Sequence, residues 1–165
     1  MISEHSTKLI DFAKQLFDKN SLEHGLPLIV KYIKDIIGAE RCSIFIYDRD
    51  KDELWTTIAD GIDRIVVNKD DGIVGYTLKI KKPVIANDTY SHEKFLDDID
   101  KQTGYKTKNI ATVPILNSNK EVGGVLELLN KNGGFSDDDL KFMVFFAHYI
   151  SGFIELTTVY DKNKG

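Results

Sequence analysis

Three aspartates at alternate positions come closest to a metal site in this sequence. Asp48, Asp50 and Asp52 open like a calcium-binding loop, in which carboxylates at alternate positions face one ion. Such a loop needs glycine at its sixth position and glutamate at its twelfth, but the sequence has Glu53 and Ala59 there. We therefore interpret the segment as a turn between two strands and expect no bound metal.

The remaining nucleophiles and metal ligands do not form a catalytic set. The histidines, at positions 5, 24, 92 and 148, are far apart and form no His-x-x-x-His pair of the zinc type. The single cysteine, Cys42, lies in an apolar run, where an inert buried thiol is expected. The sequence has no phosphate-binding glycine loop, no dinucleotide-binding glycine motif and no serine elbow of the hydrolase type. We therefore expect a regulatory or binding domain and not an enzyme, with any catalytic output in a domain outside this chain.

Composition predicts one acidic domain. The chain has 165 residues, 42% of them hydrophobic, which is enough for a single core. Its 22 basic and 26 acidic residues give a net charge of −4, which argues against a nucleic-acid binder that neutralises phosphates. A lone cysteine, no secretory signal and no apolar run of about 20 residues predict a cytoplasmic protein without a membrane span.

The hydrophobic spacing changes period along the chain and divides it into helices and strands. Spacing and turn signals predict helices over 9–17, 22–37, 72–78, 91–102 and 136–160. Short apolar runs predict strands over 42–47, 54–59, 65–67, 83–86, 110–116 and 122–129. Strands that are apolar on both faces need cover on both faces. The predicted fold class is therefore α+β, an antiparallel sheet of about six strands with the terminal helices on one face and short inserted helices on the other.

The last predicted helix is apolar around most of its circumference. Phe142, Phe145, Phe146, Tyr149 and Phe153 do not share one narrow stripe with the aliphatic residues of the same segment. One face can pack on the sheet, and the remainder would meet either a deeper core or another chain. We expect a homodimer that forms through the terminal helices.

An ordered series of short motifs resembles GAF domains. The motifs lie at 39–48 (AERCSIFIYD), 72–75 (GIVG), 83–88 (PVIAND), 95–100, 103–109 (TGYKTKN), 113–115 (VPI) and 123–131 (GGVLELLNK). The series runs in order over residues 22–155 and is most similar to the regulatory GAF domains of cyclic-nucleotide phosphodiesterases and adenylate cyclases. The resemblance implies a GAF domain over 22–155, a helix over 1–21 before it, and the end of the last helix with a tail over 156–165. It also implies a six-stranded sheet with a small-molecule pocket beneath the inserted helices.

The resemblance also implies candidate ligand contacts. By position these are Ser43, Asp60, Ile73, Val74, Asp100, Thr103, Thr107 and Glu127. Carboxylates can accept purine N–H groups, hydroxyls can bond a base or ribose, and free N–H groups at a helix start can receive a cyclic phosphate. A structural role is the alternative for each of them: Asp71 would cap the helix at residue 72, Thr103 would end another helix, and Glu127 would face solvent.

A second motif resembles a signature of the cyclic-nucleotide subgroup. It consists of Asn130, Lys131, Phe135 and Asp139, but Leu140 stands where the signature has a glutamate. We expect an architectural role, because Ser136 can cap the last helix and Lys131 can pair with Asp139 to hold the last strand to that helix.

Two departures from the family pattern bear on the ligand. Ala59 and Leu96 stand where related domains can offer aromatic residues, and aromatic contacts with a base are worth about 1–3 kcal/mol each. Two functions therefore stay open: a signal-transduction sensor of cyclic AMP, cyclic GMP or a similar small molecule, and a ligand-free module for dimerisation and signal transmission. Methionine sulfoxide reduction, as in some GAF-like proteins, needs several cysteines. Bilin attachment needs a cysteine outside the first strand, so we expect no such activity and no cofactor.

Overall fold

The computed structural model describes residues 22–59 and 65–164. The helix predicted within 1–21 and the candidate ligand contact Asp60 lie outside these residues. The described helices are α2 (Leu22–Ile37), α3 (Gly72–Ile80), the 3-10 turn η1 (Thr89–Ser91), α4 (Asp98–Thr103) and α5 (Asp137–Lys164). The strands are β1 (Ala39–Asp48), β2 (Glu53–Ala59), β3 (Val66–Asn68), β4 (Val84–Ala86), β5 (Ile110–Leu116) and β6 (Val122–Lys131).

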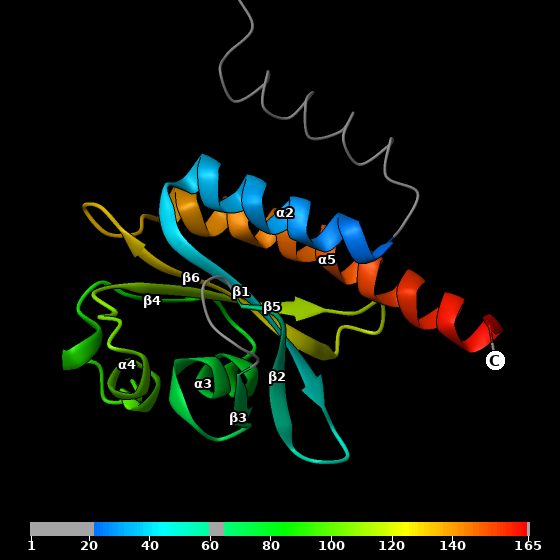
Figure 1. Cartoon of the computed structure of the whole chain (residues 1–165), viewed down its shortest axis with the longest axis horizontal. Helices are drawn as coiled ribbons and strands as arrows, with labels where there is room; N and C mark the ends of the chain where they lie inside the picture. Colours follow the sequence, from blue (N-terminus) through cyan, green and yellow to red (C-terminus); the bar gives the residue numbers. More distant parts are fainter. Residues whose placement is uncertain (1–21, 60–64, 165) are drawn as a thin grey trace, which may run out of the picture.

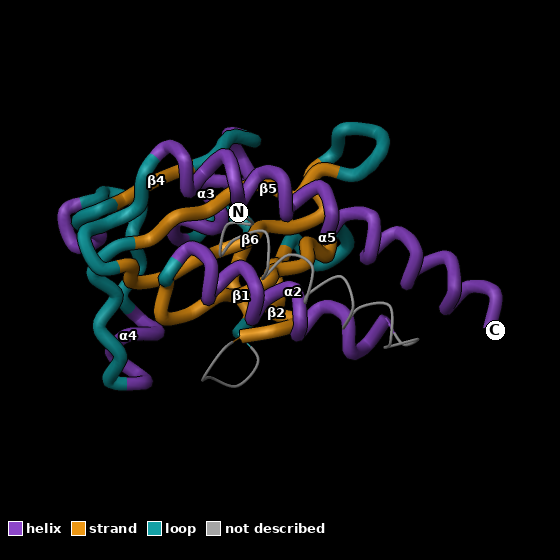
Figure 2. The backbone as a smooth tube through the Cα atoms, turned by 90° about the horizontal axis from the view of Figure 1, so that it is seen from above, coloured by secondary structure: helices purple, strands orange, loops and turns teal. Residues whose placement is uncertain are grey.

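The six strands form one antiparallel sheet in the order β3-β2-β1-β6-β5-β4. Helices α2 and α5 run side by side in opposite directions over one face, and α3 and α4 lie on the other (Figure 1). Seen from above, the end of α5 extends past the sheet (Figure 2). The fold class predicted from the sequence is confirmed.

The face under α2 and α5 forms the larger apolar core, which we call the helix-layer core. Side chains that alternate along the central strands supply one half of it, and both helices supply the other half. Its fully buried members include Cys42, Ile44, Leu128, Met143 and Ile150. The prediction that Cys42 is a buried core residue is confirmed.

The opposite face carries two smaller apolar clusters beneath α3. One contains Ile73, Ile110 and Leu129, and the other contains Phe45 and Val74. Because adjacent residues of a strand point to opposite faces, the same strands supply both layers. A Cβ atom on Gly124 would lie 2.2 Å from the Phe45 carbonyl oxygen, so β1 and β6 can approach each other here only with glycine.

Residues 91–102 do not form the single helix that the sequence predicted. The structure has η1, then turns, and α-helix only over 98–103. The Lys94 N–H donates to His92 Nδ1 and the Phe95 N–H donates to the His92 carbonyl, which closes turns in place of a helix. These turns let Phe95 pack against the cluster around Ile73, so tertiary packing outweighs the local helical pattern here.

Helix α5 is less completely buried than its composition suggested. Phe146 is buried, whereas Phe145 is 62% exposed and Tyr149 is 42% exposed. Within the described residues, no helix has the length and apolar character to cross a membrane.

Candidate ligand-binding site

A pocket lies between the sheet and the inserted segments on the α3 side. It contains about 730 Å³ of space free of protein atoms, including its open mouth. Most of its wall is apolar, and seven polar or charged residues interrupt that wall. These are Arg41, Ser43, Asp71, Asp100, Tyr105, Thr107 and Glu127.

Six of the eight candidate contacts line this one pocket. They are Ser43, Ile73, Val74, Asp100, Thr107 and Glu127. Of the other two, Asp60 lies outside the described residues, and Thr103 is the last residue of α4, with a side chain that the structure does not describe. Residues separated by more than 80 positions in the sequence thus meet in one pocket.

Glu127 is buried in the floor of the pocket. It pairs across the sheet with Ser43 on β1 and Thr112 on β5, which puts three polar side chains in one row. Its side chain is only 9% exposed, so the alternative that Glu127 faces solvent is wrong. Its position in the central strand β6 places it under α3 and not at the surface.

The Glu127 carboxyl group has no hydrogen-bond partner among the described residues. Burial, with a smaller contribution from the charge of Asp100, raises the pKa of Glu127 to about 7. A buried polar group is disfavoured unless it is hydrogen-bonded, and the described residues supply no such bond here. The carboxyl group is therefore available to a ligand as an acceptor when ionised and as a donor when protonated.

The first turn of α3 forms one wall of the pocket. Gly72, Ile73 and Val74 line it, and the N–H groups of a first turn have no partner within their own helix. Asp71 takes the N-cap position, but its carboxylate makes no capping hydrogen bond. The expected side-chain cap is therefore absent, and Asp71 lines the pocket instead. The positive end of α3 and free backbone donors thus lie where an anionic group could enter.

Asp100 and Thr107 line the pocket but bond each other. The Thr107 backbone N–H and hydroxyl both donate to the Asp100 carboxylate at 2.7 Å, and the Tyr90 hydroxyl donates to it at 2.7 Å. The Asp100 bond is the main reason that the pKa of Tyr90 is raised to about 12. These contacts fix the segment that carries Phe95 and Leu96 over the pocket.

The Asn130 side chain organises the turn before β5. Its Oδ1 accepts from the N–H groups of Lys108 and Asn109 at 2.6 Å and 3.2 Å, and its Nδ2 donates to the Lys106 carbonyl at 2.8 Å. Its Nδ2 also donates to the Tyr105 hydroxyl at 2.9 Å. Asn130 itself has a φ of 59°, a left-handed conformation that asparagine tolerates better than most residues.

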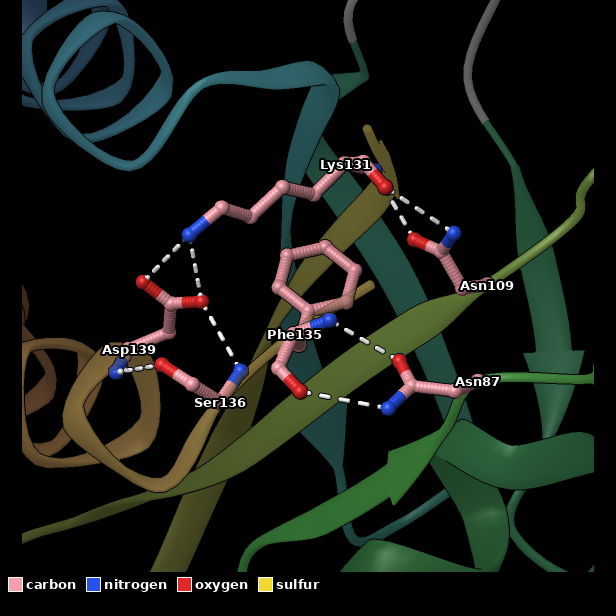
Figure 3. A network of polar contacts seen from close by, with 6 residues as sticks. All are labelled: Asn87, Asn109, Lys131, Phe135, Ser136 and Asp139. Atoms are coloured by element: carbon pink, nitrogen blue, oxygen red, sulfur yellow. Dashed lines mark hydrogen bonds and ion pairs between the residues drawn. The ribbon is translucent and has the colours of Figure 1, made fainter. Parts of the chain in front are cut away.

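Lys131 and Asp139 form the ion pair that the sequence predicted. Lys131 Nζ lies 2.8 Å and 2.7 Å from the two Asp139 carboxylate oxygens (Figure 3). Ser136 N–H donates to Asp139, and Asp139 N–H donates to the Ser136 hydroxyl, which caps α5 reciprocally. Burial raises the pKa of Asp139, but the bonds from Lys131 and Ser136 outweigh burial and hold it below its ordinary value.

Phe135 is anchored by Asn87 from the edge of the sheet. The Phe135 N–H donates to Asn87 Oδ1 at 2.8 Å, and Asn87 Nδ2 donates to the Phe135 carbonyl at 3.2 Å (Figure 3). The Phe135 ring joins the helix-layer core. None of Asn130, Lys131, Phe135 and Asp139 lines the pocket, and their contacts hold the β6–α5 connection in place.

Sequence reasoning missed Arg41, Phe95 and Tyr105 as pocket residues. Arg41 could have been found, because it lies two positions before Ser43 and alternation puts both on one face of β1. The ring of Tyr105 could not, because the loop that positions it depends on contacts with Asn130 and Glu40. Among the described residues, no group of His, Cys, Asp and Glu side chains is arranged to hold a metal ion.

Comparison with known proteins identifies the family. The family model described as GAF domain matches residues 21–154. The dual 3',5'-cyclic-AMP and -GMP phosphodiesterase 11A of Takifugu rubripes is 28% identical over 172 residues, which cover 85% of this chain and 19% of that protein. The probable 3',5'-cyclic phosphodiesterase pde-5 of Caenorhabditis elegans is 27% identical over 173 residues, which cover 95% of this chain and 24% of that protein. The chain thus spans about a quarter or less of the length of these relatives.

Solved structures share the fold at lower sequence identity. The GAF domain of a phosphoenolpyruvate-protein phosphotransferase from Coxiella burnetii has a TM-score of 0.83 at 18% identity, with 96% of each chain covered. The corresponding domain from Acinetobacter has a TM-score of 0.81 at 20% identity, with 98% of this chain and 99% of that chain covered. With its sheet, its inserted helices and a family match over residues 21–154, the chain belongs to the GAF domain family, whose members are small-molecule-sensing regulatory domains.

Proposed function

We propose that this GAF domain is a cytoplasmic sensor in signal transduction that binds a cyclic purine nucleotide in the pocket beneath α3. The observation that carries the proposal is Glu127, a buried carboxyl group without a hydrogen-bond partner among the described residues. It lies in the same pocket as the first turn of α3. A purine offers N–H groups to the carboxylate, and a cyclic phosphate offers oxygens to a helix start.

Each part of such a ligand has a counterpart in the pocket wall. Glu127 would accept an N–H of the base, and the Ser43 hydroxyl beside it would bond the base or the ribose. The backbone N–H groups of Ile73 and Val74 would receive the phosphate. Asp100 and Thr107 would contribute mainly by fixing the wall, because their polar atoms already bond one another.

The names of the relatives favour the same ligand class. One relative is a dual 3',5'-cyclic-AMP and -GMP phosphodiesterase, and the other is a probable 3',5'-cyclic phosphodiesterase. Their identity to this chain is below 30%, so the support is for the ligand class and not for a choice between cyclic AMP and cyclic GMP. Leu96 lines the pocket where related domains can offer an aromatic ring, so we expect weaker binding than with an aromatic residue at position 96.

Thermal shift with cyclic AMP, cyclic GMP and the corresponding 5'-monophosphates tests the proposal. A ligand at about 100 times its dissociation constant adds about 2.7 kcal/mol, which is roughly 5–10 °C for a domain of this size. We expect a shift with at least one cyclic nucleotide and its loss in Glu127→Gln. The control is Glu93→Gln, because Glu93 is exposed and does not line the pocket. No shift with any nucleotide would refute the proposal.

The second candidate function, a ligand-free dimerisation and signal-transmission module, has one observation in its favour. Phe145 on α5 is 62% exposed, an unusual state for a phenylalanine in the middle of a helix. We propose that a second copy of the chain covers it and forms a homodimer through the terminal helices.

Light scattering at micromolar concentration tests the dimer. We expect a dimer that dissociates in Phe145→Glu. The control is Val66→Glu, which places the same charge at another exposed apolar residue, 52% exposed and on β3. A monomeric wild type, or a dimer that Phe145→Glu does not weaken, would contradict this candidate function.

A further inference from the structure

Arg41 is a charged pocket residue whose side chain is only partly satisfied. It lines the pocket from β1, on the same strand face as Ser43. Its Nη1 atom is buried and has no hydrogen-bond partner among the residues that the structure describes. Buried polar atoms are nearly always hydrogen-bonded, and a buried part of a cation is disfavoured more strongly than a neutral group. The N–H donor of Nη1 therefore needs an acceptor that the described residues do not supply.

The guanidinium group stacks on an aromatic ring, and within residues 22–59 and 65–164 it forms no ion pair. Its central carbon lies 3.6 Å from the centre of the Tyr105 ring. The Tyr105 hydroxyl in turn donates to Glu40 at 2.7 Å and accepts from Asn130 Nδ2 at 2.9 Å. Stacking on a ring leaves the N–H groups in the guanidinium plane free to donate at its edge. The arrangement thus fixes the direction of Nη1 before a ligand arrives.

Neighbouring carboxylates do not replace that missing partner. The Glu40 carboxylate is bonded to Tyr105 and Asn130, and the bond from Tyr105 is the main reason that the pKa of Glu40 is lowered. Asp100 is bonded to Thr107 and Tyr90. The charge of Arg41 contributes to lowering the pKa of Glu40, but no described residue accepts a hydrogen bond from Nη1.

We propose that Arg41 Nη1 donates a hydrogen bond to an oxygen acceptor of the bound ligand, which makes Arg41 a specificity-determining residue of the site. This inference rests on the proposed function and adds a residue to it. Arg41 pairs with Leu129 across the sheet, and Glu127 lies two residues along β6, so the two charged groups start about 7 Å apart along the strands. A ligand of nucleotide size can span them, with an N–H group at Glu127 and an oxygen at Arg41.

Two oxygens of a cyclic purine nucleotide could fill this place: the oxo group of guanine and an oxygen of the phosphate. Cyclic GMP has both, cyclic AMP has only the phosphate, and guanosine has only the oxo group. Inorganic phosphate has neither base nor ribose and tests the anion alone. Dissociation constants for these four probes therefore show whether the oxo group of guanine or the phosphate accepts the hydrogen bond from Arg41.

The experiment measures the four probes by calorimetry or thermal shift on wild type, Arg41→Met and Arg41→Gln. We expect cyclic GMP to bind at least tenfold more weakly to both variants. The matched control is Arg49→Met, because Arg49 is exposed and pairs with Glu121 at 2.7 Å away from the pocket. If one variant does not fold, as judged by circular dichroism, the other provides the test.

The outcomes distinguish this inference from the proposed function. Loss of affinity for guanosine with unchanged affinity for cyclic AMP would assign Arg41 to the oxo group, and loss of affinity for both cyclic AMP and inorganic phosphate would assign it to the phosphate. Cyclic nucleotides that bind wild type and both variants equally well would overturn the role of Arg41 and leave the proposed function intact. Phosphate that protects wild type but not the variants, with no nucleotide binding, would support Arg41 and refute the nucleotide. No binding of any probe would overturn both.

Discussion

The two faces of the sheet are built from the same strands but differ in how completely their groups are satisfied. The face under α2 and α5 buries a continuous apolar core with residues such as Ile44, Leu128 and Met143 at 0% exposure. The face under α3 is also covered, yet it buries Glu127 and the Nη1 atom of Arg41 without hydrogen-bond partners among the described residues.

This difference separates stability from ligand recognition within one small domain. On the helix-layer side the buried contacts are mainly apolar, and the buried Ser151 hydroxyl donates to the Leu116 carbonyl, so these contacts contribute to folding. On the pocket side, unsatisfied groups lower stability in the free protein and become favourable only when a ligand supplies partners. Functional sites are where natural proteins retain groups that lower the stability of the fold.

Truncating the helix-layer core should have the largest effect. Phe146 is 2% exposed and packs against Tyr32 and Phe142 at ring-centre distances of 5.4 Å and 4.9 Å. We expect Phe146→Ala to lower the free energy of unfolding by about 3–5 kcal/mol, because it leaves a cavity. Phe95→Ala, on the pocket side, should lower the free energy of unfolding by less than half of that amount. Urea unfolding checks the pair, and equal losses would mean that the pocket side is as tightly packed.

Ionisation of Glu127 should lower the free energy of unfolding as the pH rises. Its pKa rises from 4.5 to about 7 on folding, so between pH 4.5 and pH 7 the unfolded chain releases this proton while the folded state retains it, and stability falls across that range. Wild type should therefore lose up to about 3 kcal/mol between pH 4 and pH 8 relative to Glu127→Gln. Unfolding curves across this range, with Glu93→Gln as the control, measure the difference. A difference that does not change with pH would show that Glu127 is solvated.

The ion pair of Lys131 and Asp139 should contribute a smaller amount. The two side chains are 25% and 12% exposed, and both carboxylate oxygens are bonded. Lys131→Met should lower the free energy of unfolding by about 2 kcal/mol, whereas Lys141→Met on the exposed side of α5 should change it little. Because the pKa of Asp139 is lowered on folding, this stabilisation should disappear as the pH falls through that pKa. An effect of Lys131→Met that persists undiminished in acid would contradict the ion-pair explanation.

Adding a ring to the pocket should have the smallest effect and act on binding alone. Leu96 is 44% exposed and lines the pocket, so Leu96→Tyr would place an aromatic ring at the position where related domains can offer one. We expect cyclic-nucleotide affinity to rise about tenfold, or about 1.4 kcal/mol, by stacking on the base. Val66→Tyr, beside the pocket but not lining it, is the control in the same calorimetric titration. Unchanged affinity in Leu96→Tyr would mean that the base lies elsewhere.

Much of the fold could be predicted from the pattern of the chain, and the failures have physical causes. Six strands and the helices predicted at 22–37, 72–78 and 136–160 follow from periodicity and turn residues, and the structure has each of them with ends that differ by no more than four residues. The prediction of a single helix over 91–102 was wrong because hydrogen bonds to His92 and the packing of Phe95 form turns there. Asp71 has the right residue type to cap a helix, but its side chain lines the pocket.

The sequence by itself determined the elements, their order and which strand residues share a face, because alternation and helical spacing are local properties. It also indicated six of the residues that line the pocket, through their resemblance to GAF motifs. Only the tertiary structure decided that Glu127 is buried without a partner, that Asp100 bonds Thr107, and that Arg41 stacks on Tyr105. Burial and hydrogen bonding depend on which distant segments meet, and local spacing carries no information about that.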